Sequence, residues 1–114
     1  MNLKLKPILQ SLKQELKQLY GDRLVNLTLF GSQSRGDHEP DSDIDVLVVL
    51  RSQNVSTAES PINVGEEIKR TGKIVADLSL NHDVVITCLF MDELQYQTRN
   101  NALLRNIRKD GVLI

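Results

Sequence analysis

The stretch Leu29–Leu50 reads LFGSQSRGDHEPDSDIDVLVVL, and it decides both the fold and the chemistry of the chain. Its last seven residues, Ile44–Leu50, form the most apolar run of the sequence, which predicts a central strand buried on both faces. The run LVNLTLF at Leu24–Phe30 is β-favouring and apolar at alternate positions, so it predicts a second strand that leads directly into Gly31. The polar segment 33–42 predicts a loop, with a short helical turn at most.

Two carboxylates stand at the start of the apolar strand. Asp43 and Asp45 are two residues apart, and because a strand alternates its faces, both side chains project to the same side. Two carboxylates a few ångströms apart repel each other unless a cation lies between them. Oxygen ligands of this kind suit Mg²⁺, which takes its remaining ligands from water and substrate phosphates. The pair therefore predicts a metal site.

The turn before these carboxylates has the composition of a phosphate-binding loop. Gly31 lets the backbone approach a ligand closely, and Ser32 can cap a following turn. Backbone N–H groups at such a turn point toward an anion, and Arg35 offers a fork of donors that matches phosphate oxygens. We expect Gly31, Ser32 and Arg35 to bind a nucleoside triphosphate, although Arg35 could also be a solvated loop cation.

Helices are expected on either side of this segment. Leucine and isoleucine at spacings of three and four predict a helix from about residue 6 to residue 20, which Gly21 would end. A second helix is expected at Val64–Leu80, followed by a turn at Asn81-His82. Its expected inward positions are Val64, Ile68, Val75 and Leu78.

The C-terminal third predicts a further strand and a helical segment. Asp83–Phe90, DVVITCLF, is expected to be the third strand, and the segment from Met91 to Gly111 one helix or two short ones. The final residues predict a short edge strand. Because the first two strands follow each other through a loop of moderate length, the sheet should be mixed, with helices flanking it in an α/β (α+β) domain.

Asp83 opens this third predicted strand. If the strand neighbours Ile44–Leu50, Asp83 can face the same pocket as Asp43 and Asp45, complete a two-metal site and help to activate an acceptor hydroxyl. It could also simply follow a turn. Phosphoryl-group transfer needs in-line geometry and charge neutralisation more than covalent help. Three carboxylates opposite a phosphate-binding turn therefore predict nucleotidyl transfer.

Bulk properties limit the other possibilities. With 114 residues, the chain is expected to form one domain, residues 1–114. Its net charge of −1 provides no positive field to attract nucleic acid, so direct nucleic-acid binding is not expected. No apolar run approaches the roughly 20 residues that span a bilayer, and the start of the chain does not resemble a secretory signal. The single cysteine fits a reducing compartment, so we expect a cytoplasmic protein without a membrane partner.

With these motifs, the chain resembles the minimal nucleotidyltransferases of the DNA polymerase β superfamily. The resemblance rests on Gly31-Ser32, ten residues, then Asp43-Ile44-Asp45, with Arg35 inside the spacer, and it covers nearly the whole chain. It implies a polymerase-β-like fold, ATP as substrate, and Asp43 and Asp45 as ligands of Mg²⁺, two ions being expected. Asp83 looks like the third carboxylate of this family.

The chain further looks like the antitoxin of a HEPN/MNT toxin–antitoxin pair. That resemblance implies transfer of AMP from ATP to a hydroxyl, that of a tyrosine, on a HEPN ribonuclease toxin, and a stable complex with it. Two alternatives stay open: a non-catalytic nucleotide-binding antitoxin that acts by complex formation, and a nucleotidyltransferase acting on a small molecule such as an antibiotic. The sequence leaves open the preferred base, the acceptor residue, the number of AMP units, the stoichiometry of the complex, and whether neutralisation needs catalysis or only binding.

Overall fold

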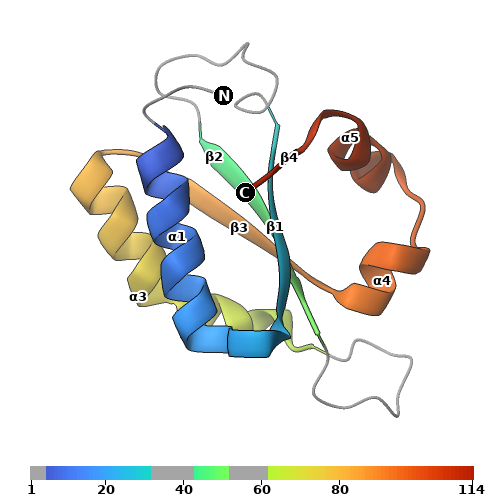
Figure 1. Cartoon of the computed structure of the whole chain (residues 1–114), viewed down its shortest axis with the longest axis horizontal. Helices are drawn as coiled ribbons and strands as arrows, with labels where there is room; N and C mark the ends of the chain where they lie inside the picture. The colour runs from blue at the N-terminus through green and yellow to red at the C-terminus, as the bar shows by residue number, and fades with distance from the viewer. Residues whose placement is uncertain (1–4, 32–42, 52–61) are drawn as a thin grey trace.

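In the computed structural model, a four-stranded mixed sheet lies between two pairs of helices (Figure 1). The structure describes residues 5–31, 43–51 and 62–114, and every statement below concerns these ranges. The strand order is β3-β2-β1-β4, with β1 antiparallel to both β2 and β4, and β2 parallel to β3. The strands are β1 Leu24–Phe30, β2 Ile44–Leu50, β3 Ile86–Asp92 and β4 Val112–Leu113. The predicted mixed sheet is confirmed.

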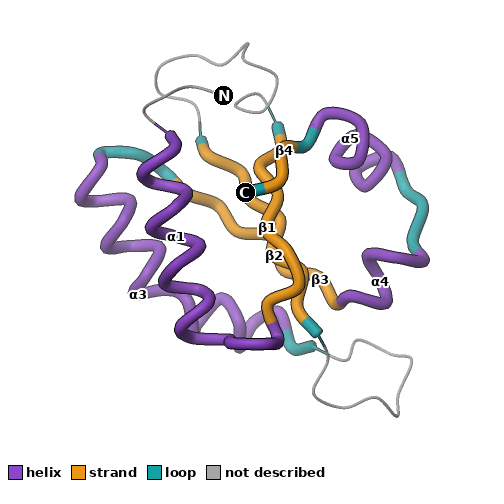
Figure 2. The backbone as a smooth tube through the Cα atoms, viewed as in Figure 1, coloured by secondary structure: helices purple, strands orange, loops and turns teal. Residues whose placement is uncertain are grey.

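The helices divide between the two faces of this sheet (Figures 1 and 2). The first pair, α1 and α3, packs on one face, and the second pair, α4 and α5, lies on the other. The bounds are α1 Leu5–Tyr20, a 3₁₀ turn η1 Gly21–Arg23, α3 Val64–His82, α4 Glu93–Thr98 and α5 Ala102–Asp110. The first helix, the first two strands and the short edge strand lie as predicted, and the segment after β3 forms two helices.

Strand β2 is the centre of the core. Six of its seven residues are buried, as expected for a strand covered on both faces. Its even-numbered side chains, such as Val46 and Val48, join the cluster beneath α1 and α3. Leu47 and Val49 join a smaller cluster with Leu104 of α5 on the opposite face. This division fixes the face on which every odd-numbered residue of β2 lies.

The predicted inner face of α3 is partly wrong. Val64 and Ile68 are 43% and 54% exposed, whereas Glu67 and Thr71 are buried. Val75 lies against the main core, as predicted, together with its neighbour Ile74 and with Leu78. Apolar spacing alone misplaced the N-terminal half of the helix, because there polar side chains face inward.

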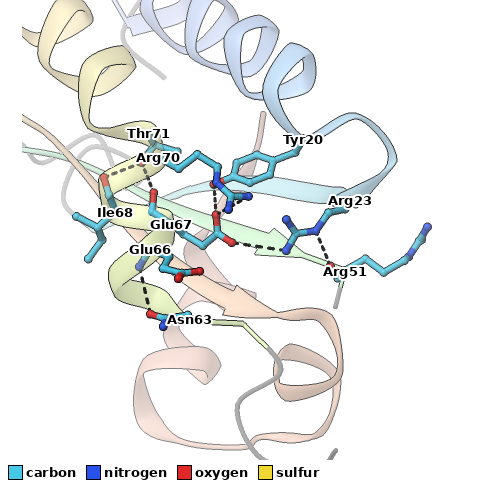
Figure 3. A network of polar contacts seen from close by, with 9 residues as sticks. All are labelled: Tyr20, Arg23, Arg51, Asn63, Glu66, Glu67, Ile68, Arg70 and Thr71. Carbon is cyan, nitrogen blue, oxygen red and sulfur yellow. Dashed lines mark hydrogen bonds and ion pairs between the residues drawn. The ribbon is translucent and has the colours of Figure 1, made fainter. Parts of the chain in front are cut away.

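A buried ion network explains these polar positions (Figure 3). The hydroxyl of Tyr20, at the end of α1, donates a 2.8 Å hydrogen bond to the Glu67 carboxylate. Arg23 and Arg70 lie 3.5 Å and 3.6 Å from the same carboxylate. The Thr71 hydroxyl donates to the Glu67 carbonyl oxygen at 2.8 Å. A buried carboxylate is tolerated when it is paired and hydrogen-bonded in this way, so Glu67 joins α1, η1 and α3.

Two predicted boundaries also differ from the structure. Asn81 and His82 form the last turn of α3 rather than a separate turn, and the turn falls on Asp83. Strand β3 begins at Ile86, three residues after the predicted start, and extends to Asp92. Within the described ranges, no helix has both the length and the apolar character needed to cross a bilayer.

Candidate active site

The two predicted metal ligands stand at the start of β2. Asp43 directly precedes the strand and is exposed, and Asp45 is its second residue and half-buried. In the sheet, Asp45 lies opposite Phe30 of β1 and beside Thr87 of β3. Asp45 therefore belongs to the same sheet face as Leu47, the face on which α4 and α5 pack further along the strand. The two carboxylates lie close enough for the charge of Asp43 to act on Asp45. Metal binding by this pair stays a prediction.

At this end, the sheet is covered on one face and open on the other. Ile44 and Ile86, which point toward α1 and α3, are 0% and 5% exposed. The opposite face differs sharply, since Val85, which directly precedes β3, is 56% exposed and Thr87 of β3 is exposed. The hydrogen-bonded ladder between the two strands extends one residue before the start of β3, because the Ile44 N–H donates to the Val85 carbonyl oxygen at 2.8 Å. The carboxylates thus lie on the accessible face of this end of the sheet, which we call the open shelf, while the other face is buried against α1 and α3.

The charge of Asp43 acts on the carboxyl group of Asp45. The pKa of Asp45 is raised, first by burial and second by the negative charge of Asp43. A carboxylate that is partly desolvated beside a like charge is stabilised when a cation binds. Two such oxygen donors on an open shelf fit a divalent ion of the Mg²⁺ type, which retains waters and open positions for phosphate oxygens.

Gly31 is packed directly against Asp45. It has a left-handed backbone conformation, with φ of 76°. A Cβ atom at this position would lie 2.7 Å from the Asp45 Oδ2 atom, closer than van der Waals contact allows. The turn backbone therefore approaches so closely that a side chain at position 31 would force the Asp45 carboxylate to move, and the left-handed backbone also favours glycine. The other two predicted nucleotide-binding residues, Ser32 and Arg35, lie outside the described residues, as does the short helical turn considered at 33–42.

Asp83 occupies a different kind of position from the one the sequence suggested. It is the C-cap of α3, with φ of 52°, and it is exposed. The alternation of side chains along a strand does not extend to Asp83, because its left-handed backbone interrupts the extended conformation before β3. In the part of the chain that the structure describes, no three His, Cys, Asp or Glu side chains are grouped so that they could hold a metal ion. A metal-binding role for Asp83 stays a prediction.

The sequence reasoning did not single out Thr87. This residue neighbours Asp45 across the parallel pair β2–β3, so its side chain lies on the same face. The signal that could have found it is the alternation of β3 itself: residues 86, 88 and 90 are the apolar or sulfur-containing positions of one face, and Thr87 is the first polar residue of the other. Finding it required the register between β2 and β3, which the sequence did not provide.

Comparison with known proteins shows the family to which the chain belongs. A family model described as "Nucleotidyltransferase domain" matches residues 9–112, and the chain belongs to this family. It is 31% identical over 80 residues to a provisionally named protein adenylyltransferase, MJ0141, of Methanocaldococcus jannaschii, covering 70% of this chain and 72% of that protein.

Two solved structures share the fold. A provisionally named nucleotidyltransferase from Sulfolobus solfataricus superposes with a TM-score of 0.59 at 22% identity, over 96% of this chain and 81% of that one. A chain of a crystal structure described as a toxin–antitoxin with AMP-PNP superposes with a TM-score of 0.56 at 16% identity, over 91% and 69% of the two chains. At these identities, the likeness supports the fold alone.

Proposed function

We propose that this nucleotidyltransferase transfers AMP from ATP to a tyrosine hydroxyl of a HEPN ribonuclease toxin and thereby acts as its antitoxin. The observation that carries the proposal is the Asp43–Asp45 pair on the open shelf, beside the glycine turn, in a chain of the nucleotidyltransferase family. The similarity to a protein named as an adenylyltransferase supports protein as the acceptor. The fold shared with a toxin–antitoxin structure supports a toxin as the partner.

The residues of the chain have separate tasks in this reaction. Asp43 and Asp45 would hold Mg²⁺, and the Gly31 backbone, Ser32 and Arg35 would bind the triphosphate. The chemistry that bound Mg²⁺ supplies is neutralisation of phosphate charge and a lower pKa of the acceptor hydroxyl. The acceptor oxygen forms a bond to the α-phosphorus, the bond to the bridging β-phosphate oxygen breaks, and pyrophosphate leaves. The hydroxyl proton passes to a carboxylate or to water.

The family resemblance implies Asp83 as a third carboxylate, whereas the described structure does not group it with Asp43 and Asp45. Its role is therefore tested separately from that of Asp43 and Asp45. We also propose that the reaction takes place in the cytoplasm, where ATP and the RNA that a ribonuclease toxin would cleave are found.

The direct test is an intact-mass measurement on the partner. The chain is incubated with ATP, Mg²⁺ and the protein encoded by the neighbouring gene, and that protein should gain the mass of one or more AMP units. Asp43→Asn should abolish the gain, whereas Asp77→Asn, which removes an exposed aspartate of α3, should leave it unchanged. If wild-type protein produces no gain in mass, the proposed activity is wrong.

A cell-based assay separates catalysis from occlusion. Co-expression with the toxin should restore growth for the wild type and for Asp77→Asn, but not for Asp43→Asn. If Asp43→Asn protects cells as well as the wild type does, the chain neutralises its partner by complex formation alone. If expression of the chain by itself confers antibiotic resistance, the acceptor is a small molecule.

A further inference from the structure

The two strands that form the open shelf place four side chains beside one another on one face. In β2 and the residue before it, these are Asp43 and Asp45, and in β3 and its approach they are Val85 and Thr87. Neighbouring strands lie about 4.8 Å apart, so each residue on one strand is within side-chain reach of its neighbour on the other. Thr87 is the neighbour of Asp45, and Val85 extends the same ladder beside Asp43.

These four side chains differ in their ability to bind a cation or a phosphate. Val85 is apolar and cannot bind a cation, and the described structure does not group Asp83 with the two carboxylates. Thr87 is therefore the residue of β3 that presents a polar group to the carboxylate pair. Its hydroxyl can accept from a metal-bound water or donate to a phosphate oxygen, and it carries no charge.

We propose that Thr87 is the third side chain of the cation–triphosphate site, in the position where a third carboxylate was expected. The pair Asp43 and Asp45 then supplies two negative charges and Thr87 a neutral ligand, instead of three negative charges. Asp43 and Asp45 would hold a divalent ion in such a site, and Thr87 would add a hydrogen-bonding group without adding charge. This inference rests on the proposed function for the identity of the ligand.

The exposure of Thr87 makes the proposal testable without disturbing the fold. Its side chain is exposed, whereas the flanking Ile86 is buried in the core, so substitution at position 87 should leave the core intact. Thr98 offers a matched control. It is an exposed threonine of α4, beyond the opposite end of β3, so a carboxylate placed there changes the net charge equally but at a distance.

The experiment measures Mn²⁺ binding by titration calorimetry, with and without the nucleotide analogue AMP-PNP. Without nucleotide, Thr87→Asp should bind Mn²⁺ about tenfold more tightly than the wild type, since a full charge is added next to Asp45, and Thr98→Asp should not. With AMP-PNP, Thr87→Val should weaken Mn²⁺ binding by about three- to tenfold, the loss of one hydrogen bond, and Thr87→Ser should restore it.

Each contrary result has a distinct meaning. If Thr87→Asp binds Mn²⁺ no more tightly than Thr98→Asp, or if Thr87→Val matches the wild type, the assignment of Thr87 is wrong. If Asp83→Asn weakens binding as strongly as Asp45→Asn does, the third position belongs to Asp83, and the assignment of Thr87 is overturned. If the wild type binds no Mn²⁺ even with AMP-PNP, the proposed metal site itself fails, and this inference fails with it. Unfolding curves of each variant confirm that the protein is folded.

Discussion

Replacement of Gly31 by alanine should have two effects that can be measured separately: a loss of stability in the turn and a displacement of the Asp45 carboxylate in the candidate metal site. The left-handed φ of 76° costs a residue with a side chain roughly 1–2 kcal/mol. The new Cβ atom would also lie 2.7 Å from the Asp45 Oδ2 atom, so the carboxylate must move away. Because that oxygen is the end of a flexible side chain, the second effect should change the site more than the stability.

Gly21 provides the matched control for this substitution. It also has a left-handed conformation, with φ of 55°, but a Cβ atom there would have no neighbour within 4 Å. Gly21 precedes β1 and Gly31 follows it, so the two glycines lie at opposite ends of the same strand. Gly21→Ala should therefore cost a similar amount of stability and leave the carboxylate pair in place.

The assay combines urea unfolding with Mn²⁺ titration of the folded protein. Both variants should lose about 1–2 kcal/mol of unfolding free energy, which corresponds to a fall in Tm of about 4 °C for each kcal/mol. Gly31→Ala should also bind Mn²⁺ about tenfold more weakly, because a group that orients a ligand has been changed. The reasoning is refuted if Gly31→Ala and Gly21→Ala bind Mn²⁺ equally well.

Three further predictions follow from the packing and the charges. Tyr20→Phe removes a 2.8 Å hydrogen bond to buried Glu67 and should lower the unfolding free energy by about 1.5–3 kcal/mol in urea; a loss below about 0.5 kcal/mol would mean that the ion pairs alone hold the carboxylate. Gly72→Ala should raise it by about 1 kcal/mol, because Gly72 lies within α3 and an added Cβ meets open space; a loss of stability would contradict this. Asp45→Asn should make the metal-free protein more stable at neutral pH. The pKa of Asp45 is raised in the folded state, so the wild type loses stability as the pH rises from 3.8, the ordinary pKa of the group, to the raised pKa of the folded protein. The stability advantage of the variant should therefore shrink as the pH falls toward 3.8. A difference in thermal unfolding that stays constant with pH would disprove this.

Much of the fold could be predicted because its strongest signals are local. The apolar run of β2 and the leucine stripe of α1 each fix an element and its buried face, and both elements lie where the sequence suggested. The inner face of α3 could not be predicted in the same way. Glu67 is buried because Tyr20 of α1 and Arg23 of η1 meet it from other elements, in addition to Arg70 of its own helix, and helical periodicity carries no information about partners from elsewhere in the chain.

The candidate site shows the same limit. The Asp43–Asp45 pair follows from strand alternation within one element, so the sequence was sufficient to bring it together. Which residue lies beside the carboxylate pair on β3 depends on the register between β2 and β3, which are separated in sequence by α3, and on the residue at which α3 ends. Because α3 continues to His82 and Asp83 caps it, the alternating pattern begins later than expected, and Thr87 rather than Asp83 is the neighbour of Asp45.

The two faces of the sheet make different contributions to the proposed reaction. Ile44 and Ile86 are buried beneath α1 and α3, so the backbone that carries the carboxylates is fixed from one side. On the other side, Asp45 is partly buried next to the negative charge of Asp43. This arrangement raises the pKa of Asp45 and destabilises the metal-free protein. A bound cation removes this repulsion. Because the repulsion raises the free energy of the metal-free protein but not that of the metal-bound protein, it increases the affinity for the cation. A stability gain in Asp45→Asn would therefore be the counterpart of lost metal binding, and the two changes should appear together in the same variant.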